Sequence, residues 1–372
     1  MNRPEQLPGD RPGIANRPGQ LPADRPGIAN RPGEGPGLGG NRPETRPDWG
    51  DKWNNSNNDF DNKFNNWQQQ NNVNVNNFQN NRSEQWNNIN DNWNDGDWHN
   101  RFDSDEYWEW RQDVVGFRGD RCEEIWGNCH GYHDHFFNHG YWGSCWWGAA
   151  AVAGTAAAVT SAIVSPWWWW RPATYTSVSS FYGPTYPTQP VDYDPGTTVV
   201  YEGDTIYIDG KEAGNAVEYR EKTIELATPP VEQYPVPEPP TEEGQPEAWL
   251  PLGVWALSQQ EQGDAVMFFQ LSVDKTGIVA GAYRNIMTNE DQPVIGQLDK
   301  ESQRVAWHVG ENKNTVYETG MSSLTYDVAS VFVHFGTEQT QTWLLVRLPS
   351  PEMPPGAVKL PEIKKPAPET QK

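Results

Sequence analysis

Seven cysteines and histidines between residues 122 and 145 are the side chains in this sequence best suited to chemistry. They are Cys122, Cys129, His130, His133, His135, His139 and Cys145. Zinc prefers such thiolate and imidazole ligands, four at a time in a tetrahedron. His135 and His139 are four residues apart and would share one face of a helix. The cluster therefore predicts a candidate zinc site formed by Cys122, Cys129, His135 and His139.

Two other interpretations of this cluster stay open. No Cys-x-x-Cys pair occurs in it, and glycines and aromatic residues interrupt any regular helix. Two of the three cysteines can instead form a disulfide, which leaves the third unpaired within the chain. The cluster can also have neither role.

The chain carries none of the common catalytic motifs. The nucleophile elbow Gly-x-Ser-x-Gly, the glycine-rich phosphate loop and the zinc-protease motif His-Glu-x-x-His are all absent from the sequence. His308 and His334 alternate with apolar neighbours in predicted strands, so we expect them to face solvent, opposite Val309 and Val333. The sequence predicts no catalytic residue and no cofactor, and we do not expect an enzyme.

Composition limits how much of the chain can fold around a core. Only 35% of the residues are hydrophobic, while Gly and Pro number 34 and 32, which predicts a largely disordered, low-complexity N-terminal half. The net charge is −22, from 50 acidic and 28 basic residues. Nucleic-acid binding needs a basic stripe that neutralises phosphates, and the sequence has none. This class of partner is therefore excluded.

Two kinds of repeat make up the first 98 residues. Within 1–50, a Pro/Gly/Arg-rich unit at 2–15 recurs at 16–29 with two changes, which predicts an extended, disordered spacer. Within 51–98, an Asn-rich unit of eleven residues places aromatic side chains in one stripe along a helix. Asparagine opposes an isolated helix. We expect either an amphipathic helix that self-associates or a disordered tract with aromatic contacts.

The next two segments are rich in tryptophan. In 99–145 we expect two short helices, at about 104–116 and 120–130, the second capped by Asp120. In 146–170, tryptophans flank an Ala-rich run that is barely long and apolar enough to span a membrane. It is either a membrane helix or a small-residue packing helix.

The C-terminal half predicts one folded β domain. A linker at 171–197 precedes a hairpin and a helix at 198–228, where Asn215 is the expected N-cap. After a Pro/Glu linker at 229–247, apolar runs separated by short turns predict about eight strands in 248–350. We expect an antiparallel meander, closed as a small barrel or curled into a sandwich. The tail, 351–372, is predicted to be disordered.

The sequence resembles one family. The stretches "WLPLGVWAL", "QRVAWHVGENKNTVYETGMSSLT" and "QTWLLVRL", together with the NRP-rich repeats, resemble uncharacterised planctomycete cell-surface proteins, some labelled mu-protocadherin-like. The resemblance implies a location in the cell envelope and supplies no active site. The calcium motifs of cadherins are absent, so no calcium ligands are inferred.

Two functions follow as expectations. The first is a cell-envelope structural or interaction protein, possessing a disordered spacer and a C-terminal β binding module, with membrane, envelope or protein partners. The alternative is a small-ligand-binding barrel of lipocalin-like or avidin-like architecture. The start "MNRPEQLPGD" does not read as a secretory signal. Either the protein stays inside the cell, or its true start lies upstream of Met1.

Overall fold

The computed structural model describes residues 98–128, 170–230, 249–259, 265–288, 290–349, 356–363 and 365. All structural statements below concern these residues. The Pro-rich repeats, the eleven-residue repeats up to residue 97 and the Ala-rich segment before Trp170 lie outside them. The predictions made for those regions therefore stay predictions.

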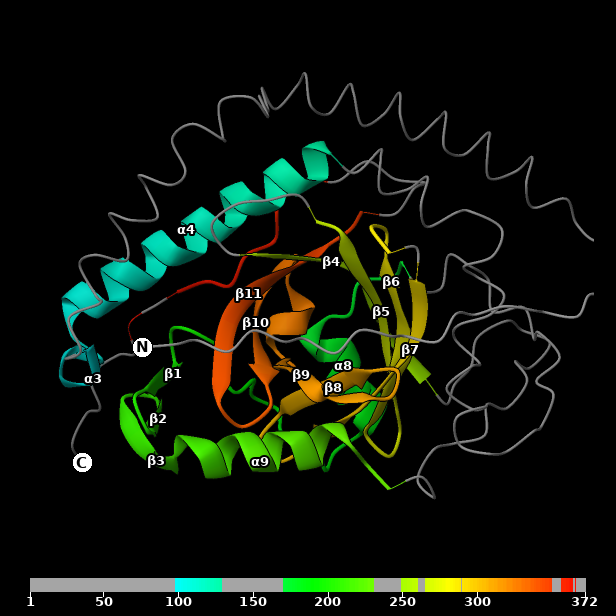
Figure 1. The fold of residues 1–372 in the computed structure, drawn as a ribbon. Helices are drawn as coiled ribbons and strands as arrows, with labels where there is room; N and C mark the ends of the chain where they lie inside the picture. Colours follow the sequence, from blue (N-terminus) through cyan, green and yellow to red (C-terminus); the bar gives the residue numbers. More distant parts are fainter. Residues whose placement is uncertain are drawn as a thin grey trace, which may run out of the picture. The chain divides into compact units, whose positions relative to one another are not determined.

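The C-terminal region is a closed barrel of eight antiparallel strands (Figure 1). Each strand pairs with the next along the chain, and the last pairs with the first, from Arg347 opposite Trp255 to Trp343 opposite Gln259. This confirms the predicted eight-stranded meander, and of the two expected forms it is the barrel. The strands are β4 (Trp249–Gln259), β5 (Met267–Asp274), β6 (Ile278–Asn285), β7 (Glu290–Asp299), β8 (Arg304–Val309), β9 (Asn312–Gly320), β10 (Val328–Phe335) and β11 (Gln339–Arg347).

Side chains fill the interior of the barrel. Alternate residues of a strand point to the same face, and those that point inward come from all eight strands to form one buried apolar cluster. At its centre the rings of Trp307 and Tyr317 stack with centroids 5.8 Å apart, and the ring of Phe269 meets Tyr317 edge-on at 5.0 Å. The interior is therefore a packed core, which an eight-stranded barrel is just wide enough to hold.

A short segment before the barrel closes one of its ends. Helix α8 (Tyr175–Tyr182) begins at Thr174, which forms a capping box with Ser177, and the Tyr182 hydroxyl donates to the Asp274 carbonyl at 2.9 Å. Val178 of this helix belongs to the interior cluster. The linker expected at 171–197 is thus a packed part of the barrel.

One long helix lies against the outside of the barrel. Helix α4 (Asp105–Gly127) begins at Ser104, whose hydroxyl accepts from the Tyr107 amide, and it follows the short helix α3 (Trp98–Arg101). The two helices expected here, with Asp120 as a cap, are therefore wrong. The buried face continues past Gly116 and Gly119 and packs against β10 and β11. This burial outweighs the cost of about 1 kcal/mol for each glycine in a helix.

A three-stranded sheet and a second helix cover another part of the barrel. The sheet is formed by β1 (Val199–Glu202), β2 (Thr205–Ile208) and β3 (Lys211–Asn215), one strand more than the expected hairpin. Helix α9 (Ala216–Ala227) follows directly, and the Asn215 side chain accepts from its first amides, which confirms the predicted cap. This helix packs on the outer faces of β7, β8 and β9.

The two histidines expected to face solvent are buried. His308 is 2% exposed and His334 is fully buried. They do point away from the barrel interior, as the alternation predicts, but α9 and the three-stranded sheet cover that outer face. The Nε2 atom of His334 lies 2.9 Å from an oxygen of Glu318, which is itself fully buried. The expected exposure was wrong because alternation assigns a residue to a face and does not say what covers that face.

None of the described helices is long and apolar enough to cross a membrane. The segment predicted as a possible span, 146–164, lies outside the described residues.

The burial of His308 makes stability depend on pH. Burial, with a smaller effect from nearby Lys313, lowers its pKa from 6.5 to about 4. Between these values the unfolded chain binds a proton that the folded chain does not, so stability falls as the pH falls from 6.5 towards 4. We expect His308→Leu to remove about 2–3 kcal/mol of the stability loss between pH 7 and pH 4.5. Urea unfolding at both pH values measures it, and an unchanged loss in the variant would contradict the assignment.

Candidate functional site

The predicted zinc ligands are only partly placed by the structure. Cys122 lies on α4, fully buried among Ile125 and Trp126 against the outer face of the barrel. Burial raises the pKa of its thiol well above the usual value. Cys129, His135 and His139 lie outside the described residues. Within the described ranges no group of three or more His, Cys, Asp or Glu side chains is placed to hold a metal. The zinc site stays a prediction.

The candidate binding site is a groove between α4 and the start of β10. It holds the chain's own segment 356–363, which runs without helix or strand structure. In Figure 1 the red trace of this segment passes between α4 and β11. We call it the bound segment. The prediction that the whole tail is disordered is wrong for these residues, which pack against the domain.

Backbone hydrogen bonds hold the bound segment at one residue. The Asp327 amide donates to the Lys359 carbonyl at 2.9 Å, and the Lys359 amide donates to a carboxylate oxygen of Asp327 at 2.7 Å. The Lys359 ammonium also donates to the Thr325 carbonyl at 3.1 Å. These two contacts use the main-chain carbonyl and amide of Lys359, so any residue except proline can make both of them.

The next residue supplies the apolar contact. Leu360 packs with Val358 against the cluster that contains Cys122. A Cβ atom added at Gly119 would lie 2.8 Å from the Leu360 Cδ1 atom. Gly119 therefore forms the seat of this leucine, because any larger side chain would occupy the same space. Gly116, one turn earlier on α4, is exposed and has open space around it.

The segment continues along α4 towards the start of the helix. The Gln112 side chain donates to the Ile363 carbonyl at 3.5 Å, and the Lys365 ammonium lies 2.7 Å from a carboxylate oxygen of Asp105. Both side chains of this ion pair are largely exposed, so it adds little affinity by itself. It does fix the direction of the segment, which runs antiparallel to the helix.

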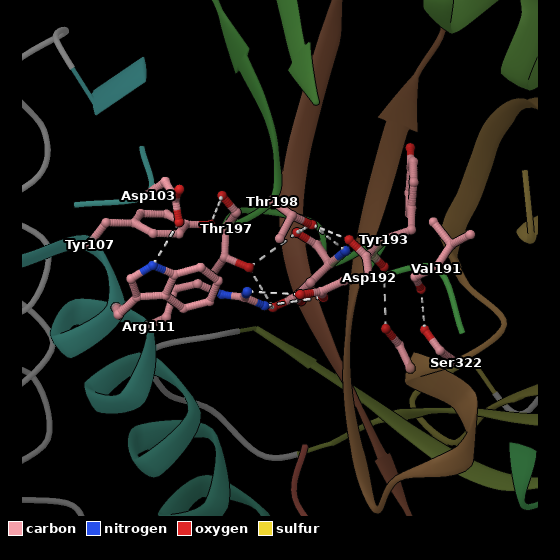
Figure 2. Close-up of polar contacts among 12 residues, drawn as sticks. Asp103, Tyr107, Arg111, Val191, Asp192, Tyr193, Thr197, Thr198 and Ser322 are labelled. Carbon is pink, nitrogen blue, oxygen red and sulfur yellow. Dashed lines mark hydrogen bonds and ion pairs between the residues drawn. The ribbon is translucent and has the colours of Figure 1, made fainter. Parts of the chain in front are cut away.

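A cavity of about 200 Å³ lies beneath the bound segment. Pro361, Glu362 and Ile363 form one of its walls, and α4 and the chain before β1 form others. Figure 2 shows Arg111 reaching from α4 to Asp192, and its two terminal nitrogens donate to the two carboxylate oxygens at 2.8 and 3.1 Å. These contacts fix the floor of the groove.

The second ion pair of the floor is buried. Arg118 donates to both oxygens of Asp194, at 2.9 and 2.8 Å, and Asp194 also accepts from the hydroxyls of Thr197 and Ser330. Burial alone would raise the pKa of Asp194, but Arg118, then Arg111, and the two hydroxyls outweigh it and hold the pKa below its usual value. Asp194 is therefore a charged anchor between α4 and β10.

The polar side chains of this site are engaged with one another. Its arginines and aspartates are paired with one another, and its hydroxyls donate to neighbouring acceptors. Sequence reasoning missed Gly119, Asp327 and Leu360. The sequence feature that could have indicated a packed tail is the run of apolar residues Val358, Leu360 and Ile363 between prolines.

Comparisons of the chain with protein-family models, with curated proteins and with solved structures find no match. The resemblance to planctomycete cell-surface proteins therefore stays a prediction.

The two aspartates of the floor should differ sharply in their effect on stability. Asp194→Asn leaves Arg118 buried without a counter-charge, which typically costs about 3–5 kcal/mol. The side chain of Asp192 is 58% exposed, and the buried Arg111 keeps Asp194 at 3.8 Å when Asp192 is replaced, so Asp192→Asn should cost less, about 1–2 kcal/mol. Urea unfolding at pH 7 compares the two matched variants. Equal, small losses would contradict the anchoring role of Asp194.

Proposed function

We propose that this chain is an interaction protein whose barrel domain binds an extended peptide on its outer surface. The observation that carries the proposal is the bound segment itself, an extended stretch with one backbone-paired residue and one seated leucine. Peptide-binding domains commonly divide the work in this way, with main-chain hydrogen bonds supplying affinity and side-chain pockets supplying specificity.

The groove is rigid enough to be a binding site in its own right. Its helical wall is attached to the barrel by the ion pairs of Arg111 and Arg118, and by the Trp126 indole, which donates to the Arg347 carbonyl at 2.6 Å. None of these contacts involves the bound segment. We therefore infer that the groove keeps its shape when the segment leaves.

A small-ligand barrel is the second candidate. The closed eight-stranded meander supports it, since such barrels can hold one small ligand. A ligand in the lumen would have to displace packed rings such as Trp307 and Tyr317, which are buried. The outer groove is therefore the stronger candidate.

We also propose a place in the cell envelope. The sequence supports it through the resemblance described above, the tryptophan-flanked segment and the long Pro-rich and Asn-rich stretches. In this proposal the N-terminal half is a spacer that also self-associates through its aromatic residues, and the barrel is presented at its end.

The peptide-binding proposal predicts competition between the bound segment and an added copy of it. Leu360→Ser in the full chain removes the seated side chain and so releases the segment. A labelled peptide of residues 354–366 should then bind the variant about tenfold more tightly than the unchanged chain, whose own segment competes at millimolar effective concentration. Fluorescence anisotropy measures both affinities.

Two controls accompany this titration. The same peptide with Leu360→Ser should bind neither chain. Lys359→Pro in the full chain removes the amide that donates to Asp327 and should open the groove to the unchanged peptide as Leu360→Ser does. A peptide that binds neither opened variant would refute the proposal.

The envelope proposal is tested by location. Fractionation of the source cells, probed with an antibody against the barrel, should recover the full chain with the membrane or outer-envelope fraction. Recovery in the cytoplasmic fraction alone would refute it.

A further inference from the structure

The groove has a second possible occupant within the sequence of this protein. We propose that it binds segments of the pattern Leu-Pro-x-x-Lys/Arg, and that its partner is an N-terminal repeat of a second copy of this chain. The inference rests on the proposed peptide-binding function and names the partner.

The pattern is shared by the bound segment and both repeats. Leu360 and Pro361 are followed after two residues by a lysine. In the repeat at 2–15, Leu7 and Pro8 are followed at the same spacing by Arg11, and the repeat at 16–29 carries the same pattern from Leu21 to Arg25. The repeats therefore present the seated leucine and the proline that lines the cavity in the same order.

The main-chain contact of the groove also fits the repeats. The residue before the leucine is bound through its main chain, at Asp327. In the repeats this residue is Gln6 or Gln20, and both have the amide that the contact needs. Further along, the segment ends at acidic Asp105 in the first turn of α4. The lysine that pairs with Asp105 is Lys365, one residue beyond the lysine of the shared pattern, so the arginine of a repeat would lie one position nearer to the leucine. Its charge is complementary to that of Asp105, although the repeats do not reproduce the Lys365 contact residue for residue.

The prolines of the repeat favour binding in an extended form. Prolines lie on both sides of Leu7, at Pro4, Pro8 and Pro12. Such spacing favours the polyproline II conformation before binding, which reduces the entropy lost on binding.

The ratio of repeats to grooves favours binding between copies. Each chain has two complete repeats, and its described residues form one groove of this kind, so at least one repeat is left for another molecule. A head-to-tail contact of this kind can extend from chain to chain or close into a ring of several copies. The bound segment competes for the same groove, so the association should be weak and should depend on concentration.

The test titrates a labelled peptide of residues 2–15 into the full chain carrying Leu360→Ser. We expect saturable binding, which Leu7→Ser in the peptide should weaken about tenfold through loss of the leucine that packs beside Gly119. Gly119→Leu, added to the same chain, fills the seat and should abolish binding. Gly116→Leu, which points into open space on the same helix, should leave it unchanged.

The outcomes separate this inference from the function on which it rests. Binding of the 354–366 peptide without binding of the 2–15 peptide overturns the inference and leaves the proposed function standing. Binding of neither peptide overturns both. Binding of the 2–15 peptide that is insensitive to Gly119→Leu also overturns the inference, because the groove is then not its site.

Sedimentation of the full chain tests association between copies. The Leu360→Ser chain should gain mass as its concentration rises, and Leu7→Ser with Leu21→Ser in that chain should remove the gain. A gain that survives these two changes would overturn the inference and assign the association to another region, such as the aromatic residues of 51–98.

Discussion

The buried guanidinium of Arg347 holds the two ends of the barrel sheet together, and the rest of the structure depends on this contact. It lies 4.2 Å from the ring centroid of Trp255 and donates to the Leu252 carbonyl at 2.7 Å and to the Leu324 carbonyl at 2.6 Å. The last strand of the barrel, β11, is thereby tied to its first strand, β4, and to the 3-10 helix η3 (Ser323–Thr325), whose Leu324 belongs to the interior cluster. Burial lowers its pKa to about 10, partly opposed by Asp327, so it stays charged at neutral pH. Only glycine fits at Gly253, where a Cβ atom would collide with this guanidinium.

The groove is built on the same residue. The Arg347 amide donates to the Asp327 carbonyl at 2.8 Å, and the Arg347 carbonyl accepts from Trp126 of α4. Asp327 in turn pairs with the bound segment. The closure of the barrel and the two walls of the groove therefore share one structural element. A peptide bound there contacts groups that hydrogen bonds already hold in place, which reduces the conformational entropy lost on binding.

The parts of the fold that the sequence predicted are those set by local pattern. Alternation at Phe269, Leu271 and Val273 gives a strand of period two, and Asn215 caps a helix through its own side chain. The parts that it missed depend on contacts distant in sequence. Gly119 reads as a helix break until Leu360, 241 positions later, is seen to fill the space beside it. The same limit applies to His334, which is covered by Tyr201 from another segment of the chain. It also applies to 171–197, where the tyrosines and prolines are typical of a linker but pack against one end of the barrel.

The energetics of Gly119 explain why a helix in this position retains a glycine. Relative to alanine, a glycine in a helix interior costs about 1 kcal/mol. Full burial of a leucine side chain contributes roughly 1.5–3 kcal/mol. Leu360 is partly buried, so its contribution is a fraction of this value and is comparable with the cost of the glycine, and it is present only while the groove is occupied. Gly116 has the same cost and no such contact, and nothing in the described structure explains it. An empty groove would keep the cost of Gly119 without the gain, so the domain is most stable when some leucine, its own or another, is bound.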